Sequence, residues 1–167
     1  MELTGTVWKF AQDDINTGLI RKQMYNHLPP QEQGRHCMES LDPEFPKKAK
    51  PGDFIVAGRN FGCGSSTPAH YAIAALGIPV IVAESFGSLF FSNCVGGAIW
   101  PIVCPGIVDL VETGDTLEID TDAYTVRNVA SGKTLQAKSL PEMYRAMILA
   151  GGEKPYLKAR LAQAAGA

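Results

Sequence analysis

The sequence has few cysteines, and their spacing excludes several kinds of site. The four cysteines of the 167-residue chain stand at positions 37, 63, 94 and 104, so no Cys-x-x-Cys pair occurs, and the three histidines form no ligand cluster. Such spacing assembles neither a zinc site nor an iron–sulfur cluster. We therefore expect no metal site on this chain, reduced thiols and a cytoplasmic protein. Cys63 lacks an identifiable base partner, which favours a packing role over a nucleophilic one.

The chain also lacks an excess of charge and a long apolar run. Its 15 Lys and Arg against 17 Asp and Glu give a net charge of -2, which argues against a nucleic-acid partner bound through phosphates. No stretch is long and apolar enough to span a bilayer, so no membrane partner is expected. The Gly-x-Gly-x-x-Gly and Gly-Lys-Ser/Thr patterns are absent, which disfavours nucleotide binding.

What the chain does have is the pattern of a single α/β domain over residues 1–167. With 46% hydrophobic residues it can bury a core without disulfides. Short apolar runs predict buried strands, and periodic runs predict helices, in a mixed sheet with flanking helices. We expect strands at 5–10, 54–57, 79–83 and 100–103, helices at 66–76, 86–95 and 140–150, and a hairpin over 115–127. Residues 24–50 read as a polar, proline-marked excursion outside the core, and residues 153–167 as a weak helix or frayed tail.

The loop between the expected strand 54–57 and the following helix carries the candidate chemistry. Gly62 and Gly64 permit sharp turns and close approach to a ligand, and Ser65 and Ser66 follow directly. At a helix start, unpaired N–H groups favour an anion and stabilise an alkoxide, so Ser65 is a candidate base. On spacing alone, helix capping by the two serines is the commoner role.

Six motifs, in order along the chain, resemble one protein family. They are Asn60-Phe61-Gly62-Cys63-Gly64-Ser65-Ser66, together with Asp13–Thr17, His36–Glu39, Leu41–Phe45, Lys50–Asp53 and Glu84–Phe86. Over about residues 5 to 105 the chain is similar to the small subunit of 3-isopropylmalate dehydratase, the swivelling domain of the aconitase superfamily. The resemblance implies an aconitase-type swivelling β/β/α domain.

The resemblance further implies a hydro-lyase that dehydrates and rehydrates a 2-hydroxy dicarboxylic acid. Its [4Fe-4S] cluster would be carried by a separate large subunit, the expected partner, and none by this chain. By position, Ser65 is the base that takes a proton from the carbon next to a carboxylate. The implied substrate-binding residues are Ser66, Thr67, Gly64, Asn16, Thr17, Asp13 and Lys22.

Several positions depart from the family pattern, and most of them lose a cation. Thr67 stands where the family has an arginine that binds a substrate carboxylate, and Gly18 replaces a motif Asp. A threonine hydroxyl lacks the charge and the planar fork of a guanidinium. Either the substrate differs from 3-isopropylmalate, or other cations serve, or catalysis is lost. The candidate cations are Arg21, Lys22, Arg35 and Arg59, or a cation of the large subunit.

Two alternatives to a 3-isopropylmalate dehydratase subunit therefore stay open. One is a dehydratase subunit for another substituted malate. The other is a catalytically silent subunit that binds a partner, which the loss at Thr67 favours and the retention of Ser65 disfavours. A homo-oligomer of the isolated chain also stays open. His70, expected about one turn into the helix, reads as a surface or core histidine because no partner is identifiable.

Overall fold

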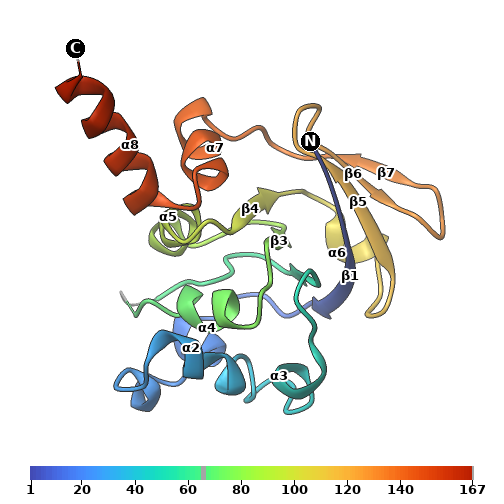
Figure 1. Cartoon of the computed structure of the whole chain (residues 1–167). Coiled ribbons are helices and arrows are strands. Elements are labelled where there is room, and N and C mark those ends of the chain that lie inside the picture. Colours follow the sequence, from blue (N-terminus) through green and yellow to red (C-terminus); the bar gives the residue numbers. More distant parts are fainter. Residues whose placement is uncertain (65–66, 167) are drawn as a thin grey trace.

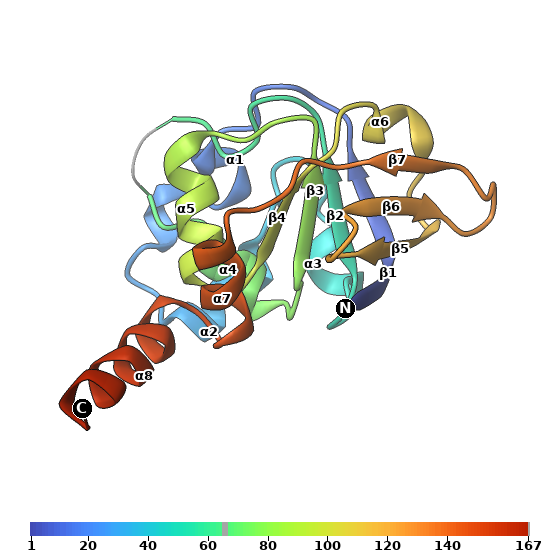
Figure 2. The same ribbon diagram turned by 90° about the horizontal axis from the view of Figure 1, so that it is seen from above.

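One mixed sheet runs through the protein. The computed structural model describes residues 1–64 and 67–166, and its seven strands lie side by side in the order β4-β3-β2-β1-β5-β6-β7 (Figures 1 and 2). Strands β1 to β4 are parallel, and β5 to β7 continue the sheet antiparallel. Their bounds are β1 Glu2–Phe10, β2 Phe54–Ala57, β3 Val80–Ala83, β4 Trp100–Val103, β5 Thr116–Asp120, β6 Thr125–Asn128 and β7 Thr134–Gln136. The predicted mixed sheet is confirmed.

Strand β1 joins the parallel part of the sheet to its antiparallel part. Its first half pairs antiparallel with β5, where Leu3 faces Ile119, and its second half pairs parallel with β2, where Val7 faces Phe54. Because parallel strands need crossover connections, helices follow β2 and β3, whereas β5 and β6 are joined by a short turn.

The core lies on both faces of the parallel strands. All four residues of β2 and of β3 are buried. Successive side chains alternate, so Ile55 and Ala57 enter one hydrophobic cluster and Phe54 and Val56 the other. Residues of α1 Thr17–Ile20, α3 Phe45–Lys48, α4 His70–Ala75 and α5 Ser88–Gly96 fill the first cluster. The second is closed by β5, β6, α6 Ile107–Leu110 and α7 Glu142–Leu149.

The expectation that residues 24–50 stay outside the core is wrong. This segment forms the short turns η1 Gln23–Tyr25, α2 Pro30–Gln33 and η2 Gly34–His36, followed by α3. Cys37, Met38 and Phe45 are fully buried in the first cluster. Prolines occupy the first helical turns of α2 and α3, where a missing N–H costs nothing, so they start short helices rather than hold the segment away from the core.

Two predicted helix starts are also wrong. Helix α4 begins at His70, with Ala69 as its N-cap and Pro68 before it, rather than at the serines. Helix α7 begins at Glu142 rather than at residue 140, and no side-chain capping bond marks its start. The C-terminal residues form a regular helix, α8 Glu153–Ala165, which buries none of its residues and extends away from the body in Figure 1.

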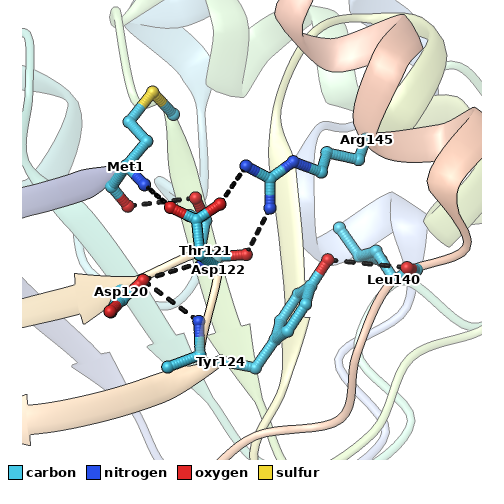
Figure 3. A network of polar contacts seen from close by, with 8 residues as sticks. Met1, Asp120, Thr121, Asp122, Tyr124, Leu140 and Arg145 are labelled. Atoms are coloured by element: carbon cyan, nitrogen blue, oxygen red, sulfur yellow. Dashed lines mark hydrogen bonds and ion pairs between the residues drawn. The ribbon is translucent and has the colours of Figure 1, made fainter.

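A polar network ties α7 to the edge of the antiparallel strands. Arg145 donates to the carbonyl of Thr121 at 2.8 Å and pairs with Asp122, which also pairs with the N-terminal amine of Met1 (Figure 3). Hydrogen bonds from both cations lower the pKa of the Asp122 carboxyl. The chain start, the β5–β6 turn and α7 are thereby held together, although each lies far from the others in sequence.

Candidate functional site

Two loops that carry motifs of the resembled family meet at the edge of the sheet where β1 and β2 end. The backbone N–H of Gly62 donates to the carbonyl of Ile15 at 2.8 Å, and that of Thr17 donates to the carbonyl of Cys63 at 3.0 Å. A side chain added at Gly64 would lie 3.5 Å from the Asn16 side chain. The Asp13–Thr17 segment therefore runs beside Cys63 and Gly64. Ser65 and Ser66, which come next, lie outside the described residues.

The acidic residues of the first loop hold the backbone of the second. A carboxylate oxygen of Asp13 accepts from the N–H of Arg59 at 2.7 Å, and Asp14 accepts from the side-chain amide of Asn60 at 2.8 Å. Asp14 and Asn60 both adopt positive φ, near 57° and 56°, where Asn and Asp are better tolerated than most residues. Asp13 thus positions the loop in this structure, and a contact with substrate stays a prediction.

The glycine at position 62 is required by close packing. Its φ is +76°, and a Cβ there would come within 2.2 Å of the Phe90 ring on α5. Both strain and collision exclude other residues. The loop also rests on the segment before α5, because the N–H of Asn60 donates to the Ser85 hydroxyl at 2.8 Å and the N–H of Phe61 donates to the Ser85 carbonyl at 3.0 Å. Part of the Glu84–Phe86 motif therefore has a structural role.

The predicted residues Asn16, Thr17 and Lys22 are already engaged. Asn16 caps α1 by accepting from the N–H of Leu19 at 3.0 Å, and Thr17 is buried. Lys22 pairs with Glu39 at 3.4 Å. Burial works to raise the pKa of Glu39, but hydrogen bonds from neighbours including Lys22 outweigh it and hold that pKa below its ordinary value. Lys22 is therefore a tethered rather than a free cation.

Arg21, one of the candidate cations, is buried, which the sequence did not indicate. It is 1% exposed, and its guanidinium donates to the side-chain oxygens of Gln33 and Asn26, both of them neutral. Its Nε has no partner, and among residues 1–64 and 67–166 no carboxylate lies within ion-pair distance. Burial lowers the pKa of Arg21. Burial together with the charge of Arg21 also lowers the pKa of His70 to about 4, so these two basic groups are neighbours.

Sequence reasoning missed a cavity beside His70. It has a volume of about 300 Å³ and lies between the start of α4, the middle and end of α5, and the start of α8. Residues that line it include His70, Tyr71, Asn93, Gly97, Glu153 and Lys154. No sequence motif joins these residues, and the packing of α4 and of α8 against α5 brings them together. The one available signal was His70, which follows the glycine-serine loop directly.

The thiols lie apart from one another. Cys37, Cys94 and Cys104 are buried, and Cys63 is half-buried. Burial raises the pKa of Cys37 and Cys94, and burial with the nearby charge of Glu84 raises the pKa of Cys104 to about 12. Within the described part of the chain, no three His, Cys, Asp or Glu side chains are grouped so as to hold a metal ion. The same residues contain no helix with the length and apolarity that a membrane crossing requires.

Comparisons with known proteins agree with this architecture. The family described as Aconitase C-terminal domain matches residues 1–106. The 3-isopropylmalate dehydratase small subunit of Heliobacterium modesticaldum is 42% identical over 98% of this chain and 99% of that protein. The isopropylmalate/citramalate isomerase small subunit of Methanocaldococcus jannaschii is 37% identical over 96% of both chains. A crystal structure of 3-isopropylmalate dehydratase from Methanocaldococcus jannaschii superposes with a TM-score of 0.93 at 38% identity and covers both chains completely.

Proposed function

The chain belongs to the aconitase C-terminal domain family, and we propose that it is the small subunit of a 3-isopropylmalate dehydratase-like hydro-lyase. The relatives that support this assignment are matched over nearly their whole length. The observation that carries it is the meeting of the Asp13–Thr17 and Asn60–Gly64 loops at one sheet edge, directly before Ser65. The substrate is a 2-hydroxy dicarboxylic acid, and the partner is a large subunit.

We assign the [4Fe-4S] cluster of the active enzyme to that large subunit. The described residues of this chain offer no ligand set for it, since three thiols are buried at separate places and their pKa values are raised. This chain contributes the base and part of the substrate cage.

Ser65 is proposed as the base of the reaction. As an alkoxide it takes the proton from the carbon next to a substrate carboxylate. The electron pair left behind forms a carbon–carbon double bond as hydroxide leaves the neighbouring carbon, and the cluster of the large subunit would accept that hydroxide. In the reverse addition the proton returns from Ser65 to one carbon and the hydroxyl is added to the other. An alkoxide at neutral pH requires preorganised donors or cations. Helix α4 starts only at His70, so its first turn does not begin at the serines, and the stabilising cation is proposed to come from the large subunit or from one of the candidate cations of this chain.

The substrate is proposed to differ from 3-isopropylmalate. Thr67 replaces the family arginine that binds a carboxylate. Thr67 and Pro68 both lie before the start of α4. Ser66, Gly64, Asn16, Thr17, Asp13 and Lys22 complete the proposed substrate cage. The relative named for both isopropylmalate and citramalate supports variation in the malate substituent within the family.

Replacement of the proposed base tests this function. Ser65→Ala in the complex with the large subunit should lower turnover by at least about 10²-fold, as is typical when a proton-transfer group is removed. The matched control is Ser131→Ala, an exposed serine in the turn before β7, which should leave turnover unchanged. Unchanged turnover in Ser65→Ala would remove Ser65 from the chemistry. An inactive wild-type complex with every substituted malate tried would favour the silent, partner-binding subunit.

A further inference from the structure

An open groove lies between α5 and α7, next to the end of β4. Its volume is about 390 Å³, and its lining includes Ser85, Phe86, Ser88, Phe91, Lys138 and Tyr144. The two helices pack against each other (Figures 1 and 2). The groove, called here the α5–α7 groove, is separate from the cavity beside His70, which lies between α4, α5 and α8.

Three half-buried aromatic rings line the α5–α7 groove. The ring centroids of Phe86 and Phe91 lie 5.6 Å apart, and those of Phe91 and Tyr144 lie 6.1 Å apart. Phe86 packs against the first hydrophobic cluster, whereas Phe91 and Tyr144 pack against the second. The rings are therefore held in place by the core and still reach the groove. Aromatic side chains of this kind are enriched where proteins bind one another.

Lys138 adds a cation that has no partner within the chain. Its backbone N–H donates to the carbonyl of Val103 at 2.8 Å, which fixes the residue beside the end of β4. Its exposed side chain forms no ion pair with any residue of the ranges 1–64 and 67–166, and the described lining of the groove contains no acid. A carboxylate of a partner would therefore complement this ammonium group without competition.

The α5–α7 groove begins beside the loop Asn60–Gly64. The hydroxyl of Ser85, which lines the groove, accepts from the backbone N–H of Asn60 at 2.8 Å. A Cβ added at Gly87, the residue before α5, would lie 2.8 Å from the carbonyl oxygen of Gly62. The start of α5 is therefore in direct contact with that loop, and a protein that covers the loop also reaches the groove.

We propose that the α5–α7 groove is a docking site for the large subunit. The inference rests on the proposed function, in which the base on this chain and the cluster on the large subunit act on one substrate. The large subunit must then cover the end of the loop Asn60–Gly64, and the groove continues that covered surface. The docking segment inserts an apolar side chain against Phe91 and Tyr144 and presents a carboxylate to Lys138.

Charge reversal at Lys138 tests the proposal in the full-length chain. The Kd between the chain and the iron–sulfur large subunit of the same organism is measured by calorimetry. Lys138→Glu should raise this Kd at least about 10-fold, because the variant loses the ion pair and repels the partner's carboxylate. Lys133→Glu is the matched control, since Lys133 is also exposed but does not line the groove, and its effect should stay below about 2-fold. Equal effects of the two variants would overturn the proposal.

A bulky side chain in the groove tests the apolar contact. Ser88→Trp should raise the same Kd at least about 10-fold, because the indole occupies the space that the partner's side chain needs. Ser131→Trp, in the exposed turn before β7, is the control and should leave the Kd unchanged. Both serines are exposed, so both variants should fold, which circular dichroism checks. A Ser88→Trp chain that binds as tightly as the wild type would overturn the proposal.

Two further measurements identify other occupants of the groove. If Lys138→Glu and Ser88→Trp leave the Kd unchanged and raise the KM for a substituted malate instead, the groove holds substrate and the proposal is wrong. If they dissociate a homodimer of the isolated chain in sedimentation, with the Kd for the large subunit unchanged, the occupant is a second copy and the proposal is also wrong.

Failure of the proposed function gives a different result from failure of the docking site. A complex inactive on every substituted malate tried, whose Kd still responds to Lys138→Glu and not to Lys133→Glu, would contradict the hydro-lyase function and keep the docking site. An active complex whose Kd responds to neither variant would keep the function and contradict the docking site.

Discussion

The carboxyl edge of β1 and β2 and the cavity beside His70 differ in how their polar groups are used. At the edge, Asp13, Asp14 and Asn60 all bond to the neighbouring loop. At the cavity, the buried Nδ1 of His70 has no partner among the described residues. Paired polar groups hold a shape, whereas unpaired buried ones cost stability until a ligand arrives. The described part of the edge is therefore a fixed scaffold that ends at Gly64, whereas the wall of the cavity contains a buried polar group that is not satisfied.

The largest expected loss of stability comes from a substitution in the edge loop, which leaves the cavity unchanged. Gly62→Ala adds left-handed strain of about 1–2 kcal/mol and a collision with Phe90 that costs about 1–3 kcal/mol more. The free energy of unfolding, measured by urea titration, should fall by the sum of the two costs. Gly114→Ala is the control, since Gly114 also has positive φ but a Cβ there meets nothing within 4 Å, and it should show the strain alone. Equal losses in the two variants would show that the loop does not pack as described.

A smaller effect is expected when the missing arginine is restored. Thr67→Arg should raise turnover of 3-isopropylmalate relative to the substrate that the wild type prefers, by roughly 10-fold, because a guanidinium restores a charge-assisted contact to a carboxylate. The measurement is kcat/KM for a panel of substituted malates with the complex. If the wild type already prefers 3-isopropylmalate, with kcat/KM of about 10⁴ M⁻¹s⁻¹ or more, the proposed substrate shift is wrong.

The pH response of His70 sharpens the description of the cavity. With a pKa of about 4, set by burial and by Arg21, the ring should stay neutral from pH 5 to 8 and titrate near pH 4 by NMR. Arg21 is the charged group that acts on the ring, and Lys154 and Glu153 line the same cavity. The unfolded chain takes up the proton near its ordinary pKa of about 6.5, so stability should fall as pH drops from about 6.5 to 4. The His70→Gln variant should lose this dependence of stability on pH. A His70 ring that titrates near its ordinary pKa would contradict the prediction and show that water reaches the ring.

The smallest effect concerns the thiols. Cys63, half-buried in the edge loop, should react with a soluble alkylating reagent before the three buried cysteines, whose thiolates are disfavoured by burial. Mass analysis under non-reducing conditions should find no disulfide, and Cys63→Ser should retain partial activity. A disulfide in the native chain would contradict the expectation of a reducing, cytoplasmic setting.

The sequence predicted the strands well because each is a short apolar run closed by turn residues. The run 54–57 coincides with β2, and 100–103 with β4. Helix starts were predicted less well. A proline after two serines is typical of a first turn, yet here Pro68 precedes α4, and tertiary contacts rather than capping chemistry set its beginning.

The sequence likewise indicated only part of the candidate site. The family motifs singled out Asn16 and Gly64, and the structure adds that their loops meet at the sheet edge, where residues that follow parallel strands gather. The cavity could not be predicted, since it joins His70 to Glu153 and Lys154 across about half of the chain. Nor could the burial of Arg21, which depends on the segment 24–50 folding over it through Asn26 and Gln33.

Reconstitution with the large subunit tests the central claim most directly. The purified chain should be colourless and inactive alone, and should gain dehydratase activity on a substituted malate when the iron–sulfur large subunit of the same organism is added. Formation of the unsaturated acid is followed by its ultraviolet absorbance. Turnover that depends on both subunits is the predicted result. Turnover by the chain alone, without iron, would contradict the account.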